Sequence, residues 1–534
     1  MTRRFFNREF LGSAIALSMS ALILAAPDDT RLPDAVMRGD GVAARNLLKQ
    51  SVDVNSAQGD GMTALHWAAS REDVELAQSL IAAGADVQAA TRNGGITPVW
   101  LAAQAGNARM VEILIKAGAN PDAPAIVGLT PLMEAASAGS VETIRTLIAR
   151  GADVNAKETT YGQTPLMFAA AFNHPEAIDV LVDHGADIGA STRTRSPGGG
   201  AAPRGGAPGR GGAGPRGAAR GGPGQRGARG TTGPRGNAPG QAATPAAPPA
   251  QPAAPANPDE ITEESVQPGN AAARVITENQ GGLTPLLYAT RQGHVEAVRA
   301  LLGKGAKINQ VGGDGTTPLL MAVINGHFDL AMELLEKGGD PKIASAAGAT
   351  PLYRTVDVQW APKSFYPQPS TKQERTGYLD LMKALLEHGA DPNARLLRQL
   401  WYTGYGFELE GVDPSGATTF WRAAEVGDLD AMKLLVAHGA DPSIATNEGV
   451  PPLLVAAGDG FHGNDAITVP GGRLPAVKFL VEDCHADVNA TDEKGGADTS
   501  IEHTHTRTYT PLHAAAARGD NEMILYLVSR GARI

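Results

Sequence analysis

The sequence predicts an all-α fold in which short helix pairs stack in chain order as a solenoid. Thr-Pro-Leu or a close variant recurs ten times, and a stop resembling Gly-Ala-Asp follows each copy. The first four stops are 34, 33 and 34 residues apart. Of the 534 residues, 42% are hydrophobic and 5% aromatic, which suits closely packed helices rich in Ala and Leu. Repeats of this length cannot bury an apolar face alone, so stacked neighbours must supply the core.

Each part of the repeat has a local physical reason, as residues 130–155 illustrate. Thr130 suits a helix N-cap, and Pro131 suits the first turn, where no amide donor is needed. A short apolar helix follows, and a turn at 138–140 interrupts it. A second helix over 141–148 shows apolar spacing with a period of 3.6 residues. Gly151 ends this helix because glycine adopts the left-handed conformation at little cost.

The ten copies share this order of cap, helix, turn, helix and glycine stop. They begin at Thr63, Thr97, Thr130, Thr164, Thr284, Thr317, Thr350, Thr418, Pro451 and Thr510. They end at Gly84, Gly118, Gly151, Gly185, Gly305, Gly338, Gly389, Gly439, His485 and Gly531. A degenerate pair, Leu32–Arg38 and Val42–Lys49, is expected to cap the N-terminal end of the array.

The pattern resembles the ankyrin repeat, whose motif is T-P-L-H-x-A followed by G-A-D-V-N. The motif's histidine is kept only at His66 and His513, which we interpret as structural hydrogen-bonding residues. The resemblance implies a β-finger turn between successive helix pairs and a protein partner held on the concave groove of fingers and first helices. Motifs for nucleophilic hydrolases, zinc proteases and phosphate-binding loops are absent from the sequence, so we expect no enzymatic activity and no cofactor.

The expected organisation follows from these repeats and from shifts in composition. It comprises an export signal at 1–26, a capping repeat at 31–60, repeats one to four at 61–190, a disordered Gly/Pro/Arg-rich linker at 191–272, and repeats five to ten at 273–534, with insertions near 357–376, 395–415, 459–473 and 491–507. We expect one continuous stack, because the repeats that flank the linker have apolar faces and no polar cap.

The N-terminus predicts export in a bacterial cell, to the periplasm or beyond. Arg3 and Arg4 precede an apolar run from Phe10 to Ala26, the layout of a signal peptide. Thr2–Phe6 resembles the twin-arginine motif, and the general export route stays open as the alternative. No membrane span is expected once the signal is removed. The single cysteine, Cys484, excludes a disulfide framework.

The linker resembles an RNA-binding arginine-glycine segment. Between Ser191 and Pro258 there are nine Arg, no Lys and no acidic residue, within a chain whose net charge is −10. The segment lacks aromatic residues for base stacking, and exported proteins seldom meet RNA, so nucleic-acid binding is not expected. We interpret the segment as a solvated tether, with contact to an anionic surface as the alternative.

Aromatic residues concentrate in the second half, where eleven of the 25 lie between Tyr353 and Trp421. We expect a partner-binding surface in and around the insertions, and the alternative is a satellite core. The candidate residues are Trp360, Phe365, Tyr366, Trp401, Tyr402, Tyr405, Phe407 and Trp421. A bound small molecule or glycan is a second hypothesis, and a host-directed effector a third. His503 and His505 are the only metal-ligand candidates, and two loop histidines do not define a site, so no metal is expected.

Overall fold

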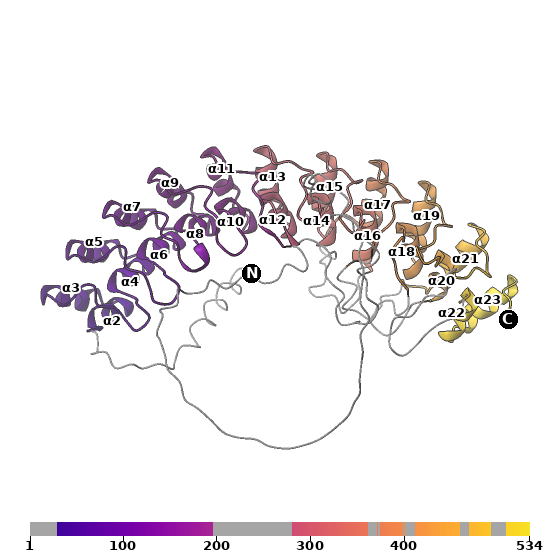
Figure 1. Cartoon of the computed structure of the whole chain (residues 1–534), viewed down its shortest axis with the longest axis horizontal. Helices are drawn as coiled ribbons and strands as arrows, with labels where there is room; N and C mark the ends of the chain where they lie inside the picture. Colours follow the sequence, from indigo (N-terminus) through magenta and orange to yellow (C-terminus); the bar gives the residue numbers. More distant parts are fainter. Residues whose placement is uncertain are drawn as a thin grey trace, which may run out of the picture. The chain divides into compact units, whose positions relative to one another are not determined.

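The structure, a computed structural model, describes residues 29–195, 280–360, 371, 374–398, 400, 412–459, 469–492 and 509–534. Within these residues, eleven helix pairs follow one another, each made of a first and a second helix (Figure 1). The first helices are α2 Arg31–Met37, α4 Ala64–Ser70, α6 Pro98–Gln104, α8 Pro131–Ala138, α10 Pro165–Ala171, α12 Pro285–Arg291, α14 Pro318–Ile324, α16 Pro351–Gln359, α18 Thr419–Val426, α20 Pro452–Ala457 and α22 Pro511–Ala517. The second helices are α3 Gly41–Lys49, α5 Val74–Ala82, α7 Ala108–Lys116, α9 Val141–Ala149, α11 Pro175–Asp183, α13 Val295–Gly303, α15 Phe328–Glu336, α17 Tyr378–Glu387, α19 Leu429–Ala437, α21 Leu474–Glu482 and α23 Asn521–Ser529. The predicted all-α solenoid is confirmed.

Eight of the nine repeat threonines cap their helices through the side chain as their spacing predicts, and Thr164 is the exception. In α4, the Thr63 hydroxyl accepts from the His66 backbone N–H, and Nδ1 of the His66 ring accepts from the Thr63 backbone N–H. His66 is fully buried, and its Nε2 lies 3.0 Å from the Ile96 carbonyl oxygen of the next finger. Burial lowers the pKa of His66, which keeps the ring neutral near pH 7. His66 therefore joins neighbouring repeats, in agreement with its predicted structural role.

The glycine stops have left-handed backbones. Gly84, Gly151 and Gly185 have φ of +91°, +92° and +92°, a conformation that glycine adopts without steric cost. His485 occupies the same repeat position with φ of +57°, so one copy of the motif has a histidine where glycine is favoured.

The fingers between helix pairs are joined by a finger ladder, in which one backbone hydrogen bond joins each of eight pairs of neighbouring fingers in the described part of the chain. Its N–H to C=O bonds are Arg92 to Asp60, Ile126 to Gly94, Thr159 to Val127, Arg193 to Tyr161, Gly313 to Gly281, Ala346 to Asp314, Leu397 to Ala347 and Asn447 to Ser415, at 2.6–2.9 Å. Each finger thus has a fixed position relative to the next.

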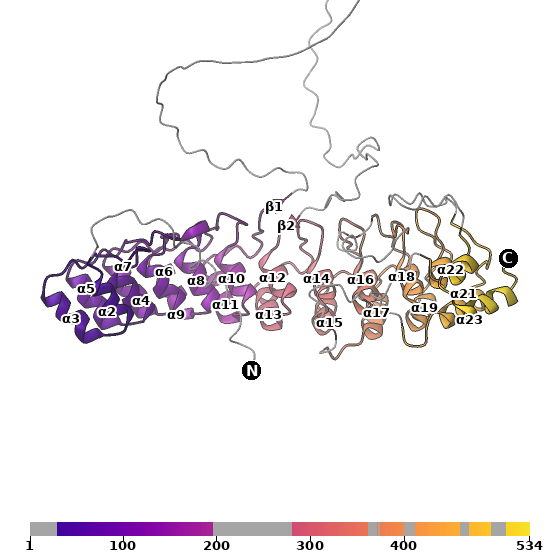
Figure 2. The same ribbon diagram turned by 90° about the horizontal axis from the view of Figure 1, so that it is seen from below.

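The predicted linker lies within one of these fingers. Strands β1 Thr194–Arg195 and β2 Gln280–Gly281 pair antiparallel, with Arg195 opposite Gln280 (Figure 2). Below them, the Thr192 N–H donates to the Leu283 carbonyl at 3.1 Å. The finger therefore closes before the chain leaves it, and residues 192–195 belong to the finger although the composition placed them in the linker. Residues 196–279 lie outside the described part of the chain.

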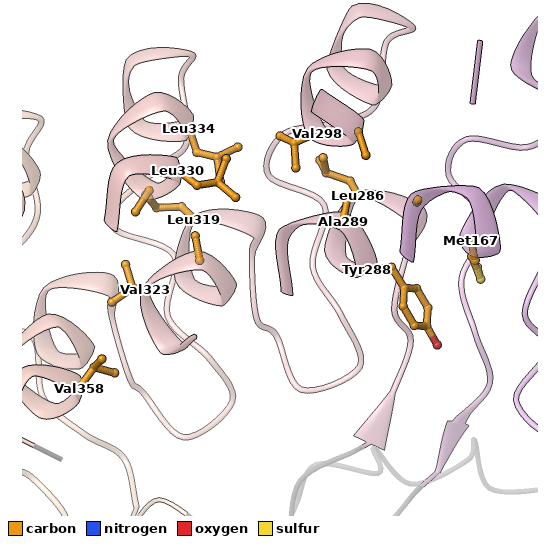
Figure 3. Close-up of a cluster of buried hydrophobic side chains, with 14 of the residues drawn as sticks. Met167, Leu286, Tyr288, Ala289, Val298, Leu319, Val323, Leu330, Leu334 and Val358 are labelled. Atoms are coloured by element: carbon orange, nitrogen blue, oxygen red, sulfur yellow. The ribbon is translucent and has the colours of Figure 1, made fainter. Parts of the chain in front are cut away.

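The repeats on the two sides of the linker stack directly, as expected. Helix α10 packs on α12, and α11 on α13. Figure 3 shows buried side chains at this junction, with Met167 from α10 and Tyr288 from α12. His294 Nε2 lies 3.0 Å from the Ala171 carbonyl oxygen across the junction. His327 makes the same contact with Arg291 one repeat later, so the junction repeats an ordinary interface.

One insertion begins later than the sequence indicated. Helix α16 continues to Gln359, whereas we expected the insertion to begin near Asp357. Asp357 and Val358 are both buried in this extra turn, which is stabilised by packing and, at Asp357, by ion pairing.

Candidate partner-binding surface

The first helices of repeats one to four leave one row of side chains open. In each helix, the residues two, three, five and six positions after the threonine are buried, while the fourth lies on the other side. These fourth residues form what we call the open column, and they are Trp67, Leu101, Glu134 and Phe168. All four are half-buried, so each is packed at its base and accessible above. Three are large and apolar, and two of these are aromatic, a side-chain type enriched in the core of interfaces.

Trp67 is held in position by hydrogen bonds. Its indole N–H donates to Gln58 Oε1 at 2.8 Å. Gln58 Nε2 in turn donates to Asp34 Oδ1 of α2 at 2.6 Å. The ring is therefore ordered before any partner arrives, which lowers the entropy cost of binding.

Glu134 is the single charged member of the open column. Its Oε2 accepts one long hydrogen bond, from Gln104 Nε2 at 3.4 Å. Burial raises the pKa of Glu134 to about 7, and the hydrogen bond from Gln104 offsets this only in part. Among the described residues, no basic side chain forms an ion pair with Glu134. This carboxylate is consequently poorly compensated when it is ionised.

The fingertips beside the open column also expose apolar side chains. Ile126 is 64% exposed, Val127 44% and Tyr161 63%. Val127 has φ of +56° within the short 3-10 turn η1 Ile126–Gly128, an uncommon conformation for a β-branched residue. Both of its neighbouring fingers are bonded to this tip, by Ile126 N–H to Gly94 and by Thr159 N–H to Val127. The ladder therefore holds a strained apolar tip in a fixed place.

The second half differs at the same repeat positions. The fourth residue after the threonine or proline is buried in α12, α14, α16, α18 and α20, where it is Tyr288, Met321, Arg354, Arg422 and Val455. Helices α18 and α20 are buried on all sides. The open column thus ends at α10.

The buried arginines belong to an ion network between α16 and α18. Arg354 pairs with Asp357, Arg422 Nε lies 3.1 Å from Asp357 Oδ1, and Arg422 Nη1 lies 2.7 Å from Glu425 Oε2. Burial alone would lower the pKa of Arg422, but the Glu425 and Asp357 carboxylates outweigh it and raise the pKa. Burial, aided by Asp357, raises the pKa of Tyr353 beside them. Sequence patterns did not identify this network, because charges at these repeat positions usually face solvent.

Two of the predicted aromatic anchors lie in the described part of the chain. The Trp421 prediction is wrong, because its ring is fully buried and its indole N–H donates to the Val450 carbonyl at 3.0 Å. It is a core side chain at the repeat position that His66 occupies. Trp360 is half-buried, packs edge-to-face on Tyr378 at 6.0 Å and donates to Asp428 Oδ2 at 2.7 Å. Its polar end is therefore satisfied inside the protein.

The remaining site predictions fall outside the described residues and stay predictions. They concern Phe365, Tyr366, Trp401, Tyr402, Tyr405 and Phe407, and the histidines His503 and His505. Within the described ranges, no group of three or more His, Cys, Asp or Glu side chains is arranged to hold a metal ion.

A second concave feature lies on the side of the second helices. A cleft of about 900 Å³ opens between α13, α15 and the segment at 374–375. Two of its charged side chains pair with each other, Arg299 with Glu333 at 2.7 Å, and Asp329 accepts from the Thr376 hydroxyl at 2.7 Å. The cleft is therefore polar and several of its charges are compensated within the chain, unlike Glu134 in the open column.

Comparison with known proteins agrees with this architecture. A family model described as ankyrin repeats (3 copies) matches residues 32–125, 101–192, 253–345 and 420–534. No curated protein matches the chain. Among the described residues, no helix is both long and apolar enough to cross a membrane. Ankyrin repeats generally mediate protein–protein interaction, and they are typically scaffolds without enzymatic activity. The family match covers more than half of the chain and agrees with the observed helix pairs. The chain therefore belongs to the ankyrin repeat family.

Proposed function

We propose that this chain is an exported scaffold that binds a protein partner on the first-helix face, with the open column as the main contact. The observation that carries the proposal is the row formed by Trp67, Leu101, Glu134 and Phe168 beside the exposed fingertips. It places two aromatic rings, the side-chain type enriched in the core of interfaces, on a fixed backbone. The proposal moves the main contact from the second half, where the sequence placed it, to the first.

The second half contributes a different kind of contact in this proposal. Trp401, Tyr402 and Tyr405 lie in the insertion near 395–415 and would extend the surface as aromatic anchors. In α16 and α18, the residues that correspond to the open column are Arg354 and Arg422. Both are buried in an ion network, so we expect them to contribute little to partner binding.

The decisive experiment compares partner capture by the full chain and by variants. In Trp67→Ala/Phe168→Ala, two open-column rings are lost, and capture should weaken about 30-fold or more, because hot-spot truncations cost about 2 kcal/mol or more. Leu525→Ala is the matched control, since Leu525 is an apolar side chain that is 71% exposed on α23, far along the chain. Circular dichroism should be unchanged in all variants, and each should remain folded at the temperature of the capture assay.

A triple variant, Trp401→Ala/Tyr402→Ala/Tyr405→Ala, separates the two halves of the proposal. Loss of capture in the triple variant alone would place the main contact in the insertion and remove the open column from it. Retention of capture in both variants would exclude both surfaces. A glycan that copurifies in place of a protein would favour the small-molecule hypothesis.

The export part of the proposal rests on Arg3, Arg4 and the apolar run that follows. The protein isolated from bacterial cells should be recovered outside the cytoplasm and should begin soon after Ala25. N-terminal sequencing by mass spectrometry checks this. An intact Met1 on protein from the cytoplasmic fraction would contradict it.

A further inference from the structure

We infer that the partner segment on the first-helix face inserts a lysine or arginine side chain at Glu134, with apolar side chains of the same segment on Leu101 and Phe168. The inference rests on the proposed function and names the chemistry of the partner.

The position of Glu134 is the first support. It lies in the middle of the open column on α8, between Leu101 on α6 and Phe168 on α10, and both of these helices pack against α8. Neighbouring helices in such stacks are about 8–10 Å apart, a distance that successive side chains of an extended segment can span. A partner that covers the two apolar side chains must therefore also cover the carboxylate.

The electrostatic surroundings of Glu134 are the second support. Helices α6 and α10 contain no charged residue, and Gln104, at 3.4 Å, is the side chain that donates to the carboxylate. On the second helix of the same repeat, the charged residues are Glu142 and Arg145, and both are exposed. Covering an ionised carboxylate without a partner costs several kcal/mol in apolar surroundings. A segment that brings no cation must leave this cost in place or take up a proton with it, and the cost of protonation grows as the pH rises above the pKa of about 7. A segment that brings a cation should therefore bind more tightly on this face at pH 8.

A basic side chain fits this site better than a metal ion does. Calcium and magnesium require several oxygen ligands, whereas the site has one carboxylate with apolar side chains on each side. Lysine and arginine have an aliphatic stem that can pack on Leu101 and Phe168 while the charged end reaches Glu134. An aromatic neighbour also favours a cation over a neutral donor.

In the second half, a carboxylate and a basic side chain at the equivalent repeat positions pair with each other within the chain. In α16, the fourth and seventh residues after Thr350 are Arg354 and Asp357, and they form an ion pair. In α8, the fourth residue is acidic and the seventh is Ser137, so the corresponding cation is not supplied by the helix itself. The partner would supply it.

The test selects peptides from a random 12-residue library displayed on phage, using the full chain and, in parallel, Glu134→Gln. Glu142→Gln is the matched control, because it neutralises an exposed carboxylate on α9 of the same repeat. Peptides selected by the unchanged chain and by the control should share a lysine or arginine flanked by apolar residues. Peptides selected by Glu134→Gln should lack this enrichment.

Calorimetry then measures one selected peptide, free of histidine, and its Lys→Met or Arg→Met version. The change should weaken binding to the unchanged chain about 10-fold and leave binding to Glu134→Gln within about 2-fold. The original peptide should also bind about 10-fold more weakly at pH 6 than at pH 8, because protonation removes the charge of Glu134. Glu134→Gln should show no such pH dependence.

The outcomes separate the inference from the proposed function. Peptides that require Trp67 and Phe168 but show no basic enrichment would overturn the inference and leave the proposed function standing. Selection of no peptide, or of peptides insensitive to Trp67→Ala/Phe168→Ala, would count against both.

Discussion

In repeats one to four, the fourth residue after each capping threonine is accessible, whereas in α16 and α18 the same residue is a buried arginine. Both regions share the same repeat plan, in which a threonine precedes the first helix and a backbone hydrogen bond joins neighbouring fingers. The two regions differ in whether the charged side chain at this position is enclosed and paired within the chain. Glu134 lies on an open face with one weak donor, while Arg354 and Arg422 are enclosed with Asp357 and Glu425.

This comparison shows that a position within a repeat does not determine its environment. A charge that is removed from water must be paired, and the closed network meets that requirement inside one chain. A charge on an open face can remain unpaired because water solvates it in part. Glu134 in the open region therefore remains available for an ion pair, whereas Arg354 and Arg422 in the closed region are already paired within the chain.

The largest expected effect comes from opening the closed network. Asp357→Ala leaves two buried arginines with one carboxylate fewer and should lower the free energy of unfolding by about 3–5 kcal/mol. Gln104→Ala changes the same repeat position in the open region and should stay within about 0.5 kcal/mol. Urea unfolding measures both. A cost below about 1 kcal/mol for Asp357→Ala would mean that water reaches the network and that the two regions are alike.

A smaller effect with a distinctive pH profile is expected at Glu134. Its pKa is about 7 in the folded chain against an ordinary value of 4.5, so the folded state favours the protonated form. The stability this contributes is full below pH 4.5 and is lost as the pH rises to about 7. Glu134→Gln should therefore stabilise the fold by about 1–3 kcal/mol at pH 8, an estimate reduced for solvent contact, and by little at pH 4. Equal effects at the two pH values would contradict the buried-carboxylate explanation.

Shortening the linker tests whether the two regions form one stack. Replacing residues 196–279 with a five-residue Gly-Ser loop should raise stability by about 2 kcal/mol, since each halving of a flexible loop gains about 0.6 kcal/mol. A Gly-Ser segment of the original length is the control and should leave stability unchanged. A loss of stability in either chain would show that the natural segment packs on the repeats.

The smallest expected difference compares two tryptophans at the same repeat position. Trp421 donates to the Val450 carbonyl, whereas the buried Trp100 Nε1 has no hydrogen-bond partner among the described residues. Replacement by phenylalanine removes similar volume at both sites, so Trp421→Phe should cost about 1 kcal/mol more than Trp100→Phe. Thermal unfolding of the pair measures this difference. Equal costs would mean that the hydrogen bond contributes nothing net.

The sequence predicted the repeat architecture because its signals are local. Thr63 caps the helix that follows it, Gly84 ends the next, and the spacing between such residues defines the pairs. The continuous stack was also predictable, from apolar faces on both sides of the linker. The position of Trp421, three residues after Thr418, was the signal that could have assigned it to the core, since His66 has the same position.

The candidate site was less predictable because it depends on what covers each face. Arg354 and Glu134 have the same repeat position, and the local difference is that α16 also contains Asp357 where α8 has Ser137. The pairing of Asp357 with Arg422 of α18 depends on the stacking of two repeats, which the sequence of either helix does not show. Composition drew attention to the aromatic-rich region, where Tyr353, Phe420 and Trp421 prove to be buried.

The finger ladder has a mechanical consequence. In the described part of the chain, each repeat packs on its neighbours and its finger is bonded to theirs, so a pulling force on one end of the array is transmitted from repeat to repeat through nearest-neighbour contacts. Such a chain of links should yield at its terminal repeats first and lengthen in steps of one repeat. Because the Thr192–Leu283 bond closes the finger beneath residues 196–279, that long segment would lie outside the force path until its own finger opens. The array should then extend stepwise under force, and the opening of this one finger should add the length of residues 196–279.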